Sequence, residues 1–585
     1  MALLGYWGRT DHPAQLEQKL AHALSSLHAQ PQAINHFFQS TSMATGLARW
    51  GVHARAGWSG DALNASLSAA ALPNETDISV SASASQLTLA RNEFGCGTLF
   101  WTEQNGIIWF ASHLQGLLPL MSKTEISVAA AYGYACFSYV PAPLTPLNNV
   151  FAVSAGSVGE FRFASDRDLI PTVNWTKPDK DWREAAEQIA EPVKDEVVAT
   201  NQLQTLLTDS MQAQLADQPN EPVGVFLSGG LDSSIAAALL VRAGARVKAF
   251  TLDFGEYGVS EMQYAEQVAA HLKIPLVKVV ASPKRVLKAL NATAQALDMP
   301  YGDGVTVPLY LLNQAASQEC AVVFNGEGGD QLFAGWTNKP LIAADIYQAV
   351  HPQAADFAQD YLRTFHRLHG YEQAVFSPAA LAETQKLNPL DWLSDALDGE
   401  SSQAMLHRLR RANLMLKGAQ NIQPRASNLS MACGLAVRSP FNNRALARWT
   451  FSVAPDLFLR EAHEKYLLKR AVEIWLPSDI VWREKRGMGV PLSQWCLGPL
   501  WRALGEWLQP ATLRAASLWQ ADLALRLAAG TVGGQLQGRR IGESLWLLLM
   551  WQVWQSTVLK QESHNALLHP FLVPAKFWQW QLNRE

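Results

Sequence analysis

The feature that most constrains the fold is a regular alternation of short apolar strands and helices in the second half of the chain. The sequence predicts strands, each followed by a helical segment, at 223–227, 247–254, 276–282 and 320–326. Strands that alternate with helices at this spacing form βαβ units, which build a doubly wound parallel sheet. Ligands of such sheets bind beyond the carboxyl ends of the strands, so the residues after 227, 252 and 326 are the first candidates for a site.

The first third of the chain has a different pattern and predicts a separate β-rich domain. The alternating segment Ile78–Arg91 suits one half-buried strand, and TLFWTE and GIIWFAS suit two more. A chain of 585 residues predicts about two to four domains. A polar stretch beginning near residue 165 favours a boundary there. We therefore expect an α/β protein with a β-rich domain over 1–175, a parallel-sheet domain over 190–560 and a tail over 561–585.

Composition excludes several classes of protein. The net charge of −4 lacks the basic excess typical of a nucleic-acid binder. Five cysteines without a CxxC pair argue against a disulfide framework and a zinc site, and favour a reducing compartment. The N-terminus lacks the pattern of a signal peptide, and the longest apolar run, LWLLLMW at 545–551, suits a buried helix. We expect a cytoplasmic protein without a nucleic-acid or membrane partner.

The strongest chemical signal is the loop SGGLDSS, which follows the strand at 223–227 and opens a helix. Gly229 and Gly230 allow a tight turn that brings backbone N–H groups to one concavity, and the helix N-terminus adds partial positive charge. The loop hydroxyls, Ser228 and Ser233 above all, can donate to phosphate oxygens, and Ser234 completes the string. Asp232 would repel phosphate alone and therefore suits a Mg²⁺ ligand. No Gly-Lys-Ser/Thr occurs here, so this is not a Walker loop.

This loop resembles the pyrophosphate loop of the N-type ATP pyrophosphatases, and further strings resemble the asparagine synthetase-like enzymes. In the second domain these are NGEGGDQLFAG at 325–335, SMA at 430–432, VRSPF at 437–441 and WREKRGMGVP at 482–491. In the first domain RNEFG at 91–95 and FAS at 110–112 resemble strings of the N-terminal-nucleophile glutaminase domain. The resemblance covers almost the whole chain and implies a β-rich glutaminase-like sandwich followed by a synthetase domain.

The resemblance implies carboxylate activation, in which ATP and a carboxylate give an acyl-adenylate that an amine attacks. Asp232 and Asp330 would hold Mg²⁺ on the leaving pyrophosphate. Lys485 would supply positive charge where negative charge develops, and Glu327 would orient or deprotonate the amine. Positions that cradle the adenosine in the family correspond to Leu227, Leu252 and Gly326.

The chain departs from the glutamine-using synthetases at the residues that handle ammonia and aspartate. Those enzymes carry a nucleophilic cysteine directly after the initiator methionine, where this chain has Ala2. Their glutamine-binding string is also absent. On the acceptor side, Ser427-Asn428 replaces an acidic-basic pair and Ala436 replaces a glutamate. We expect the first domain to be an inactive glutaminase and aspartate to be a poor substrate.

An adenylating site without an ammonia source favours an intramolecular amine. We therefore expect a lasso-peptide macrolactam cyclase, which adenylates an Asp or Glu side chain of a precursor peptide and joins it to the peptide's N-terminal amine. The resemblance implies a leader-peptide-recognition protein and a leader protease as partners. Two alternatives of the same chemistry are a β-lactam-type synthetase, which Glu327 disfavours, and an ammonia-dependent amide synthetase. An alternative of another class is a non-catalytic nucleotide-binding scaffold.

Overall fold

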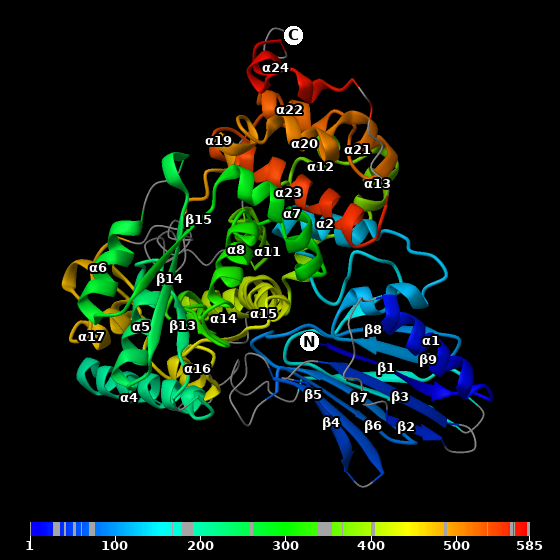
Figure 1. Cartoon of the computed structure of the whole chain (residues 1–585), viewed down its shortest axis with the longest axis horizontal. Coiled ribbons are helices and arrows are strands. Elements are labelled where there is room, and N and C mark those ends of the chain that lie inside the picture. The colour runs from blue at the N-terminus through cyan, green and yellow to red at the C-terminus, as the bar shows by residue number, and fades with distance from the viewer. Residues whose placement is uncertain are drawn as a thin grey trace.

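The computed structural model consists of a β-rich N-terminal domain and a larger domain built on a parallel sheet, with a thick layer of helices at its C-terminal end (Figure 1). The structure describes residues 2–26, 36–39, 43–50, 54–59, 61–68, 76–165, 168–177, 191–218, 220–257, 261–335, 354–365, 367–398, 404–461, 463–484, 488–534, 536–561, 566 and 568–581.

The first domain is a sandwich of two six-stranded antiparallel sheets. One sheet has the order β10-β8-β9-β1-β3-β2 and the other β12-β11-β7-β6-β5-β4. The strands are β1 (Ala2–Arg9), β2 (His36–Gln39), β3 (Met43–Trp50), β4 (Ala54–Ser59), β5 (Ala62–Leu67), β6 (Ile78–Ala82), β7 (Leu87–Arg91), β8 (Phe100–Gln104), β9 (Ile107–Ala111), β10 (Phe151–Ala152), β11 (Val158–Arg162) and β12 (Thr172–Thr176). Apolar residues of both sheets, such as Trp7 and Leu89, share one buried core. This confirms the predicted β-rich sandwich.

One strand prediction in this domain is wrong. The segment Ile78–Arg91 forms a hairpin, β6 and β7, and not a single strand. The backbone N–H of Ser83 donates to the carbonyl of Gln86 over 2.8 Å, and the Ser83 hydroxyl accepts from the Gln86 N–H over 3.2 Å. Two strands of five residues each then bury alternate side chains on the same side.

The second domain has a five-stranded, fully parallel sheet with the order β15-β14-β13-β16-β17. The strands are β13 (Val223–Phe226), β14 (Val247–Asp253), β15 (Leu276–Val280), β16 (Val322–Phe324) and β17 (Ala436–Arg438). The first four confirm the predicted strands, and β17 was not predicted. Strands β14 and β15 are added on one side of β13, and strands β16 and β17 on the other. The switch point between β13 and β16 is where such sheets bind ligands.

Helices cover both faces of the parallel sheet. Figure 1 shows α5 and α6 on one side and α8 and α15 on the other. The helices of this region are α4 (Glu196–Leu215), α5 (Leu231–Arg242), η3 (Gly255–Tyr257), α6 (Met262–Leu272), α7 (Pro283–Leu297), α8 (Thr306–Ala316), α9 (Gly329–Leu332), α14 (Met405–Asn413), the π-helix η6 (Leu414–Ile422), α15 (Gln423–Ala432), α16 (Arg444–Phe451), η7 (Pro455–Leu457), α17 (Tyr466–Val472) and α18 (Ser478–Val481). This arrangement confirms the doubly wound α/β fold.

Helix α23 (Arg539–Thr557) has a wholly buried middle, as the apolar run at 545–551 predicts. It packs against α7, α19 (Leu492–Cys496), α20 (Trp501–Leu508) and α22 (Leu523–Ala529). Outside this layer, α1 (Pro13–Ser26) packs on β1 and β3 of the first domain, and β18 (Leu459–Arg460) and β19 (His463–Glu464) form a small hairpin next to η7. The other helices are η1 (Leu114–Gly116), η2 (Leu118–Leu120), α2 (Val128–Phe137), α11 (Ala354–Arg363), α12 (Glu372–Val375), α13 (Pro378–Thr384), η4 (Pro389–Trp392), α21 (Pro510–Ala516), η8 (Pro570–Leu572) and α24 (Ala575–Gln581). Among the described residues, none of these helices is long and apolar enough to cross a membrane.

Helix α2 joins the two domains. Eight of its ten residues are buried, and they belong to the same continuous core as α23. The Tyr134 hydroxyl donates to the carbonyl of Leu547 over 2.7 Å, and the Tyr134 ring lies 5.1 Å from that of Trp551. In Figure 1, α2 lies directly beside α23.

Candidate active site

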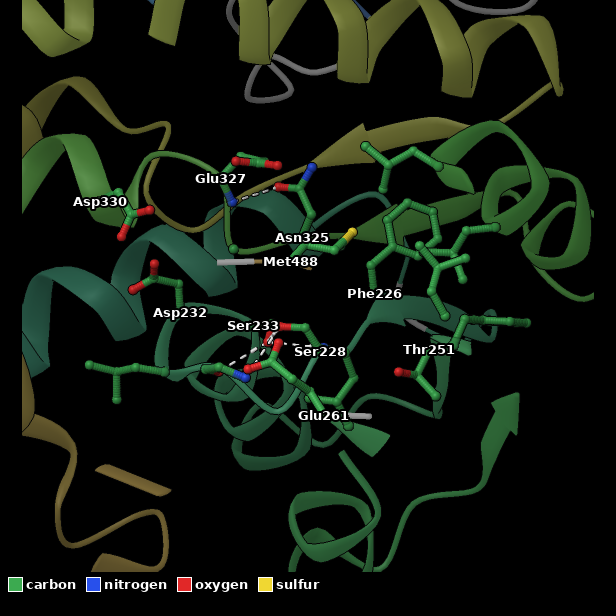
Figure 2. Close-up of a pocket in the computed structure, with 18 of the residues that line it drawn as sticks. Phe226, Ser228, Asp232, Ser233, Thr251, Glu261, Asn325, Glu327, Asp330 and Met488 are labelled. Carbon is green, nitrogen blue, oxygen red and sulfur yellow. Dashed lines mark hydrogen bonds between the residues drawn. The ribbon is translucent and has the colours of Figure 1, made fainter. Parts of the chain in front are cut away.

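A cavity of about 320 Å³ lies at the carboxyl ends of β13, β14 and β16. In Figure 2, Ser228 and Ser233 lie on one side of it, Glu327 and Asn325 on the opposite side, and Asp232 and Asp330 toward one end. The predicted residues that line it are Leu227, Ser228, Gly230, Asp232, Ser233, Leu252, Gly326, Glu327 and Asp330. Gly229 and Ser234 belong to the same loop without lining the cavity.

The loop after β13 has the form expected of an anion site. Gly230 is the N-cap of α5, so the free N–H groups of the first helical turn face the loop. The Ser228 and Ser233 hydroxyls lie 3.0 Å apart, and Ser233 also donates to the carbonyl of Gly230 over 3.0 Å. The Ser234 hydroxyl is buried and donates to the same carbonyl over 2.8 Å, so Ser234 shapes the loop from inside the helix.

Glycine is required at two positions of this loop region. Gly229 has φ +76°, and a Cβ there would lie 2.5 Å from the backbone nitrogen of Ala265. A Cβ on Gly326 would lie 2.6 Å from the carbonyl carbon of Asp232. The turn after β16 therefore packs directly on the start of α5, and this contact brings Asp330 next to Asp232.

A buried lysine bridges the two carboxylates. The Nζ atom of Lys465 lies 2.6 Å from Oδ1 of Asp232 and 2.6 Å from Oδ1 of Asp330, and its side chain is 3% exposed. Burial acts to lower the pKa of Lys465, but the two carboxylates outweigh it and hold this pKa above its usual value. Lys465 is therefore a fixed cation in the middle of the site.

Sequence reasoning missed Lys465 because the prediction of a catalytic lysine rested on the string at 482–491. That lysine, Lys485, lies outside the described residues, and its role stays a prediction. In the sequence, Lys465 is marked only by its place directly before helix α17. A lysine before a helix is too common to identify a site residue. The Lys465 backbone is in the left-handed region with φ 55°, so the side chain leaves the helix start at an unusual angle.

Glu327 lies on the cavity wall at the tip of the turn after β16. Its N–H donates to Oδ1 of Asn325 over 3.1 Å, and its carbonyl accepts from the Ser439 hydroxyl over 2.6 Å. Both backbone groups are thus held, and the side chain projects into the cavity (Figure 2). The position suits the predicted contact with an amine.

The other end of the cavity is apolar. Phe226, Phe250 and Leu252 line it, together with the Thr251 side chain. Flat apolar surroundings with a few polar groups suit a purine base and ribose. Leu227, only 1% exposed, contributes to this wall while serving mainly as core.

The two carboxylates fit the divalent cation that an ATP-using site needs. Mg²⁺ is commonly held by one or two carboxylates, with phosphate oxygens and waters completing its shell. Asp232 and Asp330 provide such a pair, and no group of three or more metal-ligating side chains occurs among the described residues. When bound, the metal would neutralise charge on the leaving pyrophosphate.

The predicted acceptor-side changes lie away from the cavity. Ser427 donates to the carbonyl of Gln423 and Asn428 to that of Leu297, and both are buried without lining the cavity. On the same helix, Arg425 does line it. Sequence reasoning missed Arg425 because it precedes the SMA string by five residues and only the helical turn of α15 brings it to the cavity wall.

A parallel sheet, an anion loop at the switch point and paired carboxylates around a lysine define a class of protein, the ATP-dependent synthetases. Comparisons with known proteins agree. The asparagine synthase family matches residues 202–556, more than half of the chain, and a glutamine amidotransferase domain matches residues 78–169. The chain therefore belongs to the asparagine synthase family, and at that level it is an ATP-dependent amide-forming ligase.

Individual relatives are distant. The chain is 24% identical to asparagine synthetase [glutamine-hydrolyzing] 1 of Bacillus subtilis, over 80% of this chain and 74% of that protein. It is 28% identical to a putative asparagine synthetase [glutamine-hydrolyzing] of Mycobacterium tuberculosis, over 83% of this chain and 76% of that protein. A solved NH3-dependent NAD synthetase from Campylobacter jejuni is similar over 32% of this chain and 92% of its own, with 16% identity and a TM-score of 0.19.

Proposed function

We propose that this protein is a lasso-peptide macrolactam cyclase. A side-chain carboxylate of a precursor peptide attacks the α-phosphorus of ATP, and the bond to pyrophosphate breaks. The peptide's N-terminal amine then attacks the acyl-adenylate, AMP leaves, and the amine gives up a proton. The peptide loses one water in total. A leader-recognition protein and a leader protease would act beside it in the cytoplasm.

The residues of the site have separable roles in this proposal. Ser228, Ser233 and the N–H groups at the start of α5 would bind the pyrophosphate. Asp232 and Asp330 would hold Mg²⁺, and Lys465 would move from the carboxylates to the phosphates once the metal is present. Glu327 would accept the proton or orient the amine on the opposite wall.

The cysteines of the first domain support an amine source other than glutamine. Cys96 and Cys136 are both buried, and burial raises the pKa of each thiol well above its usual value. A thiol nucleophile must be accessible and readily ionised. The other three cysteines, at 320, 433 and 496, lie in the second domain.

The observation that carries the proposal is the close packing between the first domain and the synthetase site. A void of only about 10 Å³ separates Glu93 and Phe94 from Gln331 and Gly418. Such a void is about the size of one water molecule. Ammonia made in the first domain would have to cross this contact, and so narrow a void favours an amine that reaches the cavity from another side.

Paired polar groups close the same contact. Gln423 and Asn442 exchange two amide hydrogen bonds of 2.9 Å each, and the Cys96 thiol lies against both. The Gly95 backbone is pressed on the second domain, because a Cβ there would lie 2.1 Å from the Ala419 carbonyl oxygen. The amine must then enter from the open side of the cavity, which suits the end of a peptide.

The test is to incubate the protein with Mg·ATP, a candidate precursor peptide and the leader protease, and to measure the mass of the peptide by mass spectrometry. We expect the loss of one water, one AMP per ring, and no dependence on ammonia or glutamine. Glu327→Gln should retain pyrophosphate exchange with the peptide while losing ring closure. Amide formation from a free amino acid and ammonia, without any peptide mass loss, would instead support an ammonia-dependent amide synthetase.

A further inference from the structure

A buried carboxylate, Asp303, organises a cluster of charged groups beside the cavity. Its side chain accepts four hydrogen bonds: from the Ser138 hydroxyl over 2.8 Å, Asn421 Nδ2 over 2.7 Å, Arg367 Nη2 over 3.1 Å and Arg425 Nη1 over 3.1 Å. Burial acts to raise the pKa of Asp303, but the neighbouring cations outweigh it and lower this pKa to about 2. Asp303 is therefore a permanent anion, and each of its carboxylate oxygens accepts two hydrogen bonds.

Arg425 is held by this cluster through one nitrogen only. Its Nη1 donates to Asp303 and, over 3.3 Å, to Oδ1 of Asn421. Its Nε is buried without a hydrogen-bond partner, and its Nη2 donates to no residue in the described part of the chain. The side chain is 6% exposed, and the residue lines the cavity together with Glu327 and Asp330.

The unused edge of Arg425 has a specific shape. Nε and Nη2 point the same way from a planar guanidinium, so together they present two parallel N–H groups. This fork matches the two oxygens of a carboxylate and gives a bidentate, charge-assisted pair. A buried donor left unpaired is costly, so an enclosed edge of this kind indicates a ligand.

The charge around Arg425 also favours an added anion. Arg367, Arg425 and Lys417 surround Asp303, while Glu543 pairs with the far side of Arg367 over 3.1 Å. Lys417, on the π-helix η6, makes no ion pair with any described residue. Lys417 itself is exposed. Three cations thus face two carboxylates, Asp303 and Glu543, and an added carboxylate would balance them.

We propose that Arg425 binds the substrate carboxylate that the enzyme activates, through Nε and Nη2, and that Asp303 is the positioning residue that fixes this edge toward the cavity. The inference rests on the proposed function, because it assigns the acyl-substrate contact of that same site. The oxygen that attacks the α-phosphorus releases its hydrogen bond, and the other oxygen stays bound as the acyl carbonyl. The guanidinium also offsets the repulsion between the carboxylate and the triphosphate.

The test is direct binding of small probes to the full chain in the presence of Mg²⁺ and a non-hydrolysable ATP analogue. The probes are N-acetyl-aspartate and N-acetyl-glutamate α-amides, each compared with its neutral carboxamide counterpart by calorimetric titration. We expect the wild-type protein to prefer one carboxylate probe over its carboxamide. Arg425→Leu should weaken that carboxylate roughly 10- to 100-fold and remove the preference, as expected for the loss of a charge-assisted hydrogen-bond pair. Nucleotide binding should stay unchanged.

Arg367→Leu is the matched control. It removes the other arginine on Asp303 and disturbs the same cluster, but Arg367 does not line the cavity. We expect it to lower stability while keeping the carboxylate preference. If Arg425→Leu does not fold, Arg425→Lys decides, because it keeps a cation near Asp303 but lacks the planar fork and should lose most of the preference.

Several outcomes would overturn the inference: a wild-type protein that does not distinguish the probes, an equal loss in Arg425→Leu and Arg367→Leu, or an unchanged preference in Arg425→Leu and Arg425→Lys. The proposed function fails separately. Carboxylate binding that depends on Arg425, without any ring closure of a peptide, would retain this inference and refute the cyclase. Ring closure by Arg425→Leu with an unchanged KM for the peptide would refute this inference and retain the cyclase.

Discussion

Replacing Lys465 by methionine removes the only charge of this side chain while keeping most of its apolar stem. In the wild-type protein one buried ammonium lies 2.6 Å from oxygens of both Asp232 and Asp330. Removing one partner of a buried ion pair typically costs about 3–5 kcal/mol, because the remaining charges are left uncompensated. Here two carboxylates would lose the ammonium that lies between them. We expect the free energy of unfolding at neutral pH to fall by about 3–5 kcal/mol.

A divalent cation should reverse this loss. Mg²⁺ can take the place of the ammonium between the two carboxylates, and a ligand that binds only the folded state stabilises it. Urea unfolding with and without saturating Mg²⁺ measures the effect, independently of any catalytic turnover. The Lys465→Met variant should gain far more stability from Mg²⁺ than the wild-type protein, in which Lys465 competes with the metal.

Lys386→Met is a suitable control, because Lys386 is 67% exposed and pairs with Glu383 on the surface. An exposed pair contributes about 0–1 kcal/mol, so this variant should unfold close to the wild-type midpoint. A Lys465→Met protein as stable as wild type in the absence of Mg²⁺ would refute the reasoning. So would a destabilised variant that Mg²⁺ leaves unchanged.

Two further predictions follow from the loop and from the buried cluster. Gly229→Ala should abolish pyrophosphate exchange, because the left-handed backbone and the contact with Ala265 would strain the loop by about 1–3 kcal/mol or more. Gly57→Ala is the control, because no atom lies within 4 Å of a Cβ placed there, and it should leave pyrophosphate exchange unchanged. The pKa of Asp303 is lowered from 3.8 to about 2, so its ionised form contributes stability above pH 4 that is lost as the pH falls toward 2. Asp303→Asn should therefore flatten the dependence of the unfolding free energy on pH in this window by roughly 2 kcal/mol, and an unaltered slope in acid titrations followed by circular dichroism would contradict the assignment.

The parallel sheet could be predicted because its information is local. Each of β13, β14, β15 and β16 is an apolar run next to a helix, so neighbouring residues suffice to predict it. Strand β17 has only three residues and forms by pairing with β16, which is more than a hundred residues earlier in the chain. Such a strand depends on tertiary pairing and leaves little trace in local periodicity.

The hairpin of β6 and β7 was missed although its turn is local in the sequence. From Ile78 to Leu89 the alternation of apolar and polar residues breaks only at Ser85–Gln86, where two polar residues are adjacent, and a single break of this kind is a weak sign of a turn. The deciding factor is the hydrogen bonding of Ser83, whose side chain competes with the strand ladder. Glycine or proline would have marked this turn, and neither is present.

The site was predictable where it lies within one loop and hidden where it depends on distant segments. Ser228 and Asp232 follow directly from the strand–loop–helix pattern. Lys465 reaches Asp232 across 233 positions, and Arg425 reaches Asp303 across 122. Long basic side chains are common on protein surfaces, and only the folded arrangement distinguishes these two as buried partners of carboxylates.

The burial of helix α2 bears on how such a chain can evolve. A domain that loses its chemistry is usually free to shrink or disappear, but α2 supplies one wall of a core that it shares with α23. Deleting the first domain would expose Trp551 and its aromatic neighbours to solvent and remove the hydrogen bond from Tyr134 to the carbonyl of Leu547. Selection on the folding of the second domain alone is therefore enough to retain the first, whatever reactions the latter still performs.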